Sequence, residues 1–86
     1  MRASHILVST AAQAHSILAE ASPANFAELA QKYSSCPSKA NGGDLGDFGP
    51  GMMVKPFEDA TIATSIGAIS LPVQTQFGYH LIHRTG

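Results

Sequence analysis

The segment GYHLIHR, residues 78–84, has the alternation and the branched and aromatic side chains that are typical of a β-strand. A second such segment, ASHILV at residues 3–8, lies at the opposite end of the chain. Each contains one histidine, His5 in the first segment and His80 in the last. Either these histidines are polar residues within a small core, or the two strands are neighbours in a sheet and the histidines act as a pair.

Two helices are expected after the first strand. Thr10 and Gln13 form a T-x-x-Q capping box, and Pro23 ends the helix that follows it. Asn25 and Glu28 form a second box, N-x-x-E. The apolar residues after each box have helical spacing, and we expect them in the core: Ala14, Ile17, Leu18 and Ala21, then Phe26, Leu29, Ala30 and Tyr33.

The second half of the chain mixes turns, short strands and one helix. Residues 34–51 contain five of the eight glycines, and GDLGDF at 43–48 has the pattern of a short strand between turns. A short helix is expected over 55–64, and a strand over AISLPV at 68–73. This order of elements predicts one α+β domain over residues 1–86, with a mainly antiparallel sheet.

Composition excludes several classes of protein. The chain has 86 residues, of which 44% are hydrophobic and 13% charged, which favours a packed globule over a disordered chain. The net charge of -1 and the dispersed Lys and Arg residues argue against a nucleic-acid partner. A single cysteine, Cys36, excludes an intrachain disulfide, and the histidine spacing does not fit a zinc site. His15 and His83 are both expected at the surface.

Neither a membrane-spanning segment nor a signal segment is evident. The apolar runs are only a few residues long, and the first residues lack the charged-then-apolar pattern of a secretory signal. These observations lead us to expect a cytoplasmic protein with no membrane association. A domain excised from a longer protein also fits them.

Four motifs together resemble the parvulin family of peptidyl-prolyl cis/trans isomerases. They span almost the whole chain in the order and at the spacing of that family: HILV at 5–8, CPS at 36–38, NGGDLGDFGPGMMVKPFEDA at 41–60 and TQFGYHLI at 75–82. The resemblance implies a four-stranded antiparallel sheet surrounded by about four helices. It also implies a substrate class, namely proline-containing peptides and unfolded protein chains.

The resemblance also implies roles for individual residues. His5 and His80 match the paired histidines beneath the active site, Thr75 matches the threonine that hydrogen-bonds the pair, and Cys36 matches the cysteine beside the reacting peptide bond. The expected pocket for the proline ring is apolar and consists of Leu45, Met53, Phe57 and Phe77. The histidine pair would hold the floor of this site and tune Cys36, unless its role is purely structural.

Isomerisation of an X–Pro bond makes modest demands on a protein. The barrier to rotation is about 18–20 kcal/mol, and a turnover of roughly 100 per second requires a reduction of about 5–6 kcal/mol. No covalent bond has to break, so neither a cofactor nor a metal is expected. An apolar pocket that removes water from the prolyl carbonyl, and a polarised Cys36 near that oxygen, would both disfavour the planar amide relative to the twisted one.

Two other functions compete with this interpretation. Cys36 could be the nucleophile of a hydrolase, with His5 or His80 as its base. Alternatively, the chain could bind proline-containing segments without isomerising them.

The loop VSTAAQAHS, residues 8–16, contains no Lys or Arg with which to bind a phosphate before the proline. We therefore expect a monomeric, general folding helper that acts on unmodified chains.

Overall fold

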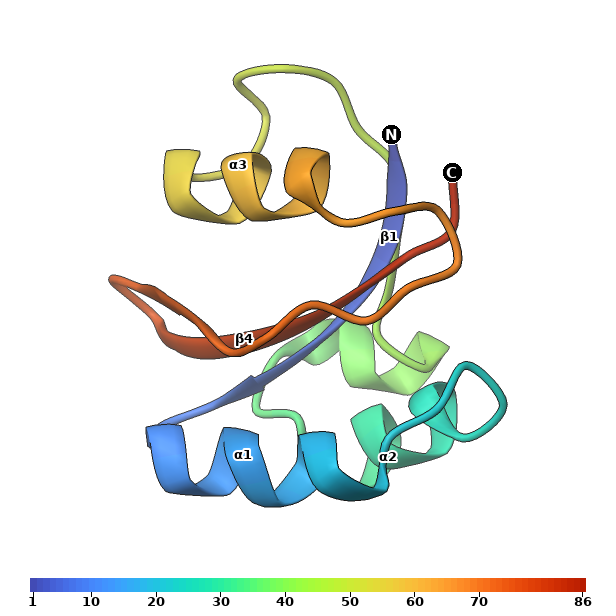
Figure 1. The fold of residues 1–86 in the computed structure, drawn as a ribbon, viewed down its shortest axis with the longest axis vertical. Helices are drawn as coiled ribbons and strands as arrows, with labels where there is room; N and C mark the ends of the chain where they lie inside the picture. The colour runs from blue at the N-terminus through green and yellow to red at the C-terminus, as the bar shows by residue number, and fades with distance from the viewer.

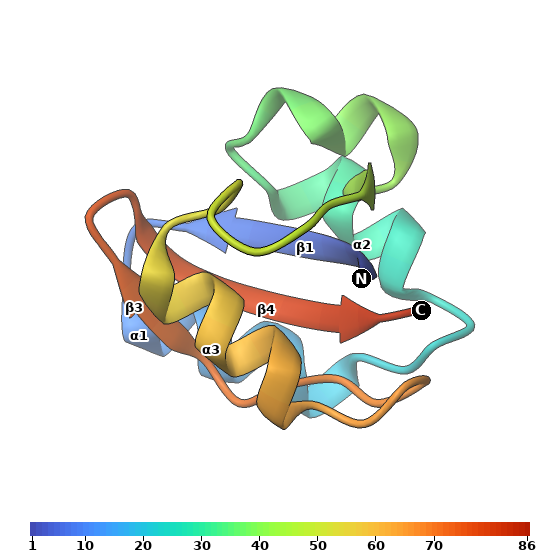
Figure 2. The same ribbon diagram turned by 90° about the horizontal axis from the view of Figure 1, so that it is seen from above.

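The computed structural model describes all 86 residues, and its first and last strands are neighbours, as the family resemblance implies. The elements are β1 (Arg2–Val8), α1 (Ala11–Glu20), α2 (Phe26–Tyr33), the 3₁₀ helix η1 (Pro37–Asn41), β2 (Asp44–Asp47), α3 (Lys55–Ala63), β3 (Val73–Thr75) and β4 (Gly78–Arg84). All strand pairs are antiparallel, in the order β2-β1-β4-β3. Figure 2 shows β1 and β4 side by side in the middle of the sheet.

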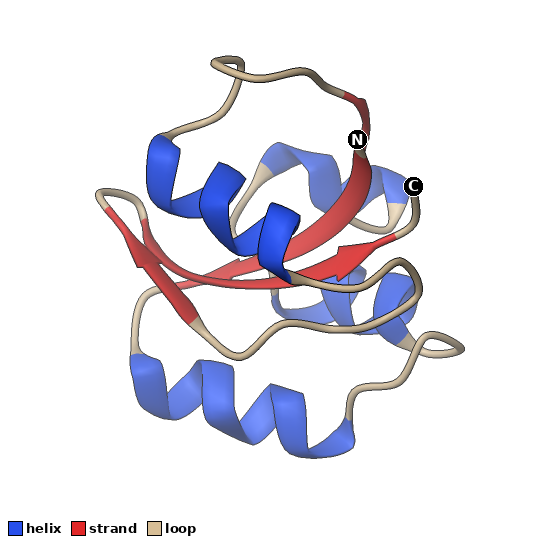
Figure 3. Ribbon diagram, turned by 45° about the horizontal axis from the view of Figure 1, so that its top comes forward, coloured by secondary structure: helices blue, strands red, loops and turns tan.

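Helices cover both faces of the sheet. α1 and α2 lie on one face and α3 lies on the other (Figure 1 and Figure 3). Because strand side chains alternate between faces, Ile6 and Val8 of β1 point to the core under α1 and α2, whereas Ala3 and His5 point towards α3. The sheet therefore separates two small cores: Ile6, Val8, Ala14, Ile17, Phe26, Leu29, Ala30 and Leu81 on one side, and Ala3, Phe48, Phe57 and Ile82 on the other.

The first helix begins as its capping box predicts, whereas the second does not. Thr10 caps α1 by accepting a hydrogen bond from the Gln13 N–H at 3.2 Å. Asn25 precedes α2, but its side chain accepts from the Ser22 N–H at 2.7 Å and donates to the Glu20 carbonyl at 2.8 Å. The predicted second capping box is therefore wrong, because Asn25 closes the turn between the helices instead of capping α2.

The glycine-rich segment lies directly against β1. Gly43 has a φ of +81°, and a Cβ atom at this position would collide with the backbone carbonyl of His5. Its own carbonyl accepts a hydrogen bond from the His5 N–H at 2.9 Å. The short predicted strand is present as β2, whereas the helical turn η1 was not predicted. Gly43 thus allows this segment to hold the backbone of β1 at His5.

The strand predicted over residues 68–73 is wrong for most of its length. Only Ile69 forms a β-bridge there, with His83, and β3 begins at Val73. The ladder is interrupted because the Ile82 N–H donates to the Ser70 hydroxyl at 3.1 Å instead of to a carbonyl. Pro72 follows and has no N–H to donate.

Three further predictions concern burial. Tyr33 was expected in the core, but its side chain is 40% exposed. His15 is exposed, as expected, whereas His83 is only partly exposed and packs against the Phe26 ring with 5.4 Å between ring centroids.

None of the helices is both long enough and apolar enough to span a membrane.

Candidate active site

His5 and His80 meet on the face of the sheet that α3 covers. The β1–β4 register pairs His5 with Ile82 and Leu7 with His80, so the two histidines are diagonal neighbours. Their Nδ1 atoms are 3.0 Å apart, their rings stack with 5.2 Å between centroids, and both residues are buried. The predicted pairing is therefore confirmed in its geometry.

The pair forms the centre of a chain of hydrogen bonds. His5 Nε2 lies 3.1 Å from the Ser38 hydroxyl, and His80 Nε2 lies 2.7 Å from the Thr75 hydroxyl. Thr75 also accepts a hydrogen bond from the Phe77 N–H at 3.2 Å. Thr75 occupies the place that the sequence predicts, whereas Ser38 was not among the predicted site residues.

All hydrogen bonds between Ser38, His5, His80 and Thr75 must donate in the same direction, because a neutral imidazole has one N–H donor and one acceptor nitrogen. If His80 donates from Nδ1, His5 carries its proton on Nε2 and donates to Ser38. If His5 donates from Nδ1, the order reverses and His80 donates to Thr75. Either order gives the two rings opposite tautomers. The Phe77 N–H donor to Thr75 is compatible with both orders, because a hydroxyl has two acceptor lone pairs.

Burial keeps the two rings neutral at neutral pH. Loss of hydration and, to a smaller extent, the neighbouring His80 lower the pKa of His5 to about 4. Loss of hydration also lowers the pKa of His80 to about 4. Protonation of both rings would replace the Nδ1–Nδ1 hydrogen bond by a contact between two N–H donors. The floor of the site is therefore uncharged.

Phe57 of α3 covers the pair from above. Its ring stands edge-on to both imidazoles, with centroid distances of 5.6 Å to His5 and 5.2 Å to His80. The same ring packs against Phe48 in the core beneath α3, and Phe57 is only 3% exposed. Phe57 therefore belongs both to the wall of the site and to the core.

A pocket of about 510 Å³ opens above the histidines, within the usual size range of small-ligand sites. Seven of the eight predicted site residues line it, and the eighth, Thr75, supports it through His80. None of its lining side chains is an Asp, Glu, Lys or Arg. The lining residues are His5, Leu7, Ser35, Cys36, Pro37, Leu45, Met52, Met53, Val54, Phe57, Phe77 and His80.

Cys36 lies in the pocket wall, although its thiol makes no hydrogen bond with either histidine. The backbone N–H of Cys36 donates to the Ser34 hydroxyl at 3.3 Å, and the residue is partly exposed. All four imidazole nitrogens are already engaged by Ser38, Thr75 or the other ring. The structure therefore shows no direct hydrogen bond through which the histidine pair would polarise the Cys36 thiol in the way that the resemblance led us to expect.

The site also contains residues that the sequence interpretation missed. Met52 is 68% exposed and stands with Phe77, which is 60% exposed, at the open part of the pocket. Ser38 is the most informative omission, since it binds His5 from η1. The hydroxyl two residues after Cys36 in the CPS motif was a possible signal, but only the position of η1 shows which ring nitrogen it reaches.

Comparisons with known proteins agree with this geometry. The foldase protein PrsA of Geobacillus sp. (strain WCH70) is 51% identical over 99% of this chain, which spans 32% of the PrsA length. Pin1 of Digitalis lanata, a peptidyl-prolyl cis-trans isomerase, is 55% identical over 74% of this chain and 54% of its own. The solution structure of NmPin, the parvulin of Nitrosopumilus maritimus, matches with a TM-score of 0.82 and 40% identity, over 100% of this chain and 95% of that one.

The four-stranded sheet with its paired central histidines is that of a parvulin domain. The family model for the PPIC-type PPIase domain, also called rotamase, matches residues 5–86, and the chain belongs to this family. It spans about a third of the length of the PrsA relative that it matches.

The neutral histidine pair generates a prediction about acid stability. The folded pKa of each ring, about 4, lies below the unfolded value of about 6.5. Between these values the unfolded chain binds more protons, so the free energy of unfolding falls as the pH drops from about 7 to 4. We expect a slope of at most about 1.4 kcal/mol per pH unit for each ring. Urea unfolding at a series of pH values measures it.

Two variants serve as controls for this measurement. His5→Leu/His80→Leu should have a shallower dependence on pH, because the two titrating rings are gone. His15→Leu removes an exposed histidine from α1 and should keep the wild-type dependence. A double variant as acid-sensitive as the wild type would contradict the assignment of this effect to the pair.

Proposed function

We propose that this chain catalyses cis/trans isomerisation of X–Pro peptide bonds by non-covalent rotation, as a folding helper for flexible chains. One observation carries the proposal: an apolar pocket of about 510 Å³ lies on a buried and neutral histidine pair. The family membership and the PrsA and Pin1 relatives support the same activity.

The pocket suits a reaction whose barrier comes from amide resonance and which breaks no covalent bond. Met53, Phe57 and Leu45 provide an apolar surface for the proline ring, while the other side of the bond remains free to rotate. The planar amide is stabilised by charge separation that the twisted amide lacks, so removal of water from its carbonyl favours the twisted state. A reduction of about 5–6 kcal/mol corresponds to roughly 10⁴-fold in rate. No group in this scheme needs to exchange a proton with the substrate.

Each residue of the floor then has a positioning role. The uncharged histidine pair offers no ionic partner that would hold the carbonyl oxygen in its charge-separated form. Ser38 and Thr75 complete the hydrogen bonds of the two rings, so no buried ring nitrogen competes for the substrate. Cys36 contributes a weakly polar thiol to the wall.

The cysteine hydrolase is the weaker alternative. A nucleophilic thiol needs a base within hydrogen-bond reach, and the four nitrogens of His5 and His80 are engaged elsewhere. The second alternative, a module that binds proline-containing segments without isomerising them, would have the same pocket. Only a measurement of isomerase activity distinguishes it from the enzyme.

Isomerisation of a short Ala-Leu-Pro-Phe peptide tests the proposal. The wild-type chain should accelerate the cis-to-trans step, and Met53→Ala should lower kcat/KM about tenfold, equivalent to about 1.4 kcal/mol, through loss of apolar contact with the proline ring. Met53 is a cleaner choice than Phe57, whose burial in the core would confound activity with folding.

Thermal unfolding of Met53→Ala controls for loss of structure. Its Tm should stay within a few degrees of the wild-type value, because Met53 is only partly buried. Binding of the peptide without any acceleration would instead assign the chain to the non-catalytic alternative.

The uncharged pocket also suggests a preference for unmodified substrates. No Lys or Arg lines it, and the turn after β1 consists of Ser9 and Thr10 before α1 begins. A phosphoserine before the proline would carry nearly two negative charges without a basic partner. The proposed substrates are therefore unmodified proline-containing segments. The predicted cytoplasmic location and monomeric state remain predictions.

A pair of peptides tests this preference. The kcat/KM for Ala-Leu-Pro-Phe should exceed the value for Ala-phosphoserine-Pro-Phe by about tenfold or more, because the phosphate loses hydration without gaining an ion pair. An Ala-Glu-Pro-Phe peptide controls for a single negative charge. A tenfold preference for the phosphorylated peptide would contradict this account of the substrate.

A further inference from the structure

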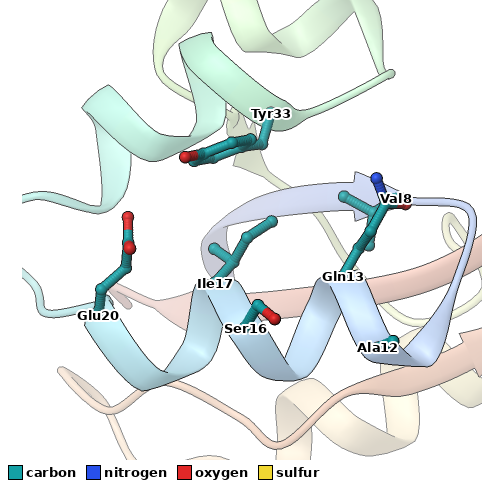
Figure 4. A pocket seen from close by; sticks show the side chains of 7 residues that line it. All are labelled: Val8, Ala12, Gln13, Ser16, Ile17, Glu20 and Tyr33. Carbon is teal, nitrogen blue, oxygen red and sulfur yellow. The ribbon is translucent and has the colours of Figure 1, made fainter.

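A second groove lies on the opposite face of the sheet from the histidine pair. It runs between α1 and the end of α2, beside the last residue of β1, and its volume is about 290 Å³. Figure 4 shows the residues that line it: Val8, Ala12, Gln13, Ser16, Ile17, Glu20 and Tyr33. None of these residues takes part in the candidate active site.

The groove has an apolar floor and a polar end. Val8 and Ile17 belong to the core under α1 and α2, and they form its floor. Tyr33 forms one wall and keeps 40% of its surface exposed, although its helical position predicted burial. The carboxylate of Glu20 and the hydroxyl of Tyr33 lie at the same end of the groove (Figure 4). The small side chain of Ala12 lies at the other end of the groove from Glu20 (Figure 4).

We propose that this groove binds a flexible chain segment in which an apolar side chain is followed closely by Lys or Arg. The apolar side chain lies over Ile17 and Val8, and the cationic one extends along the Tyr33 ring to Glu20. The groove thereby gives an unfolded substrate a second, non-catalytic contact. This role in turnover rests on the proposed isomerase function, whereas the binding itself does not.

The charges around the groove favour a cationic partner. Glu20 is the only Asp, Glu, Lys or Arg among the lining residues. Lys32 stands outside the groove with its ammonium 5.1 Å from the centroid of the Tyr33 ring. Its pKa is raised first by Tyr33 and further by Glu20 and Glu28, so these two carboxylates already attract a cation at this position. A long Lys or Arg side chain, with an apolar stem and a charged end, matches both parts of the groove.

The two sites can hold one chain only if that chain is long enough. They lie on opposite faces of a domain that measures 29 × 26 × 22 Å. A path around half of its perimeter is roughly 35–40 Å, which needs about ten or more extended residues at roughly 3.3–3.6 Å each. A tetrapeptide therefore occupies the catalytic pocket alone, whereas an unfolded protein can reach both sites.

Titration of the ¹⁵N-labelled 86-residue chain with acetyl-Ser-Leu-Ala-Arg-Ser-amide tests the binding. This peptide has no proline, and acetyl-Ser-Leu-Ala-Glu-Ser-amide is its matched control. We expect saturable shifts confined to α1, α2 and the end of β1, with the arginine peptide only. Glu20→Gln should weaken binding at least threefold, and Lys32→Gln should strengthen it about twofold by removal of the competing cation. Equal binding of both peptides, or no saturable shift, would overturn the proposal.

The variant Ala12→Leu tests whether binding in the groove contributes to turnover of an unfolded substrate. Ala12 is exposed on α1, so leucine is compatible with the helix and fills the groove. This variant should lose the arginine-peptide shifts and keep the wild-type kcat/KM for the tetrapeptide. Its kcat/KM for an unfolded protein with proline-limited refolding should fall threefold or more. An unchanged kcat/KM of Ala12→Leu for the unfolded protein would overturn the role of the groove as a second substrate contact. A wild-type chain that is inactive on the tetrapeptide would instead refute the proposed isomerase function. In that case the peptide titration alone decides whether the groove binds a chain segment.

Discussion

The hydrogen bond between the Nδ1 atoms of His5 and His80 is the contact on which the site depends. It requires β1 and β4 to be neighbours in one particular register, because a shift of one residue would turn one ring to the other face of the sheet. Both rings are buried, so every nitrogen needs a partner, and Ser38 and Thr75 supply the two that remain. Elements from distant parts of the chain are thus connected through two imidazoles.

The two faces of the central sheet cover different kinds of core. Under α1 and α2 lies an apolar core that needs no polar partner and supports the central strands. Under α3 the core is smaller and gives way to the pocket, where Phe57 contacts both histidines. An uncharged floor beneath apolar walls is a poor environment for a charge-separated amide. The proposed isomerisation needs a barrier reduction of about 5–6 kcal/mol and no acid–base chemistry.

Much of the fold could be predicted from the sequence because its signals are local. The strands around His5 and His80 alternate, the helices have regular apolar stripes, and the α1 cap depends on residues three positions apart. The strand predicted at 68–73 failed because a side chain, that of Ser70, replaces a backbone partner of β4. The alternative role of Asn25 likewise depends on the turn before α2, which its capping pattern does not reveal.

The eight predicted site residues came from family resemblance, and the structure brings them together around one pocket. Ser38 escaped prediction because its contact with His5 depends on where η1 lies, and the absence of a hydrogen bond between Cys36 and the histidines is likewise visible only in three dimensions. Tyr33 shows the limit of periodicity most clearly. A helical stripe predicts which side of α2 faces inward, but not that the groove beside its last residue leaves Tyr33 40% exposed.

The most direct test of the neutral hydrogen-bonded pair is long-range ¹H–¹⁵N NMR of the imidazole rings at pH 7. Burial lowers both pKa values to about 4, so we expect both rings to be neutral at pH 7. The Nδ1–Nδ1 hydrogen bond then makes them opposite tautomers, one protonated on Nδ1 and the other on Nε2. An imidazolium at either position, or the same tautomer in both rings, would contradict the account.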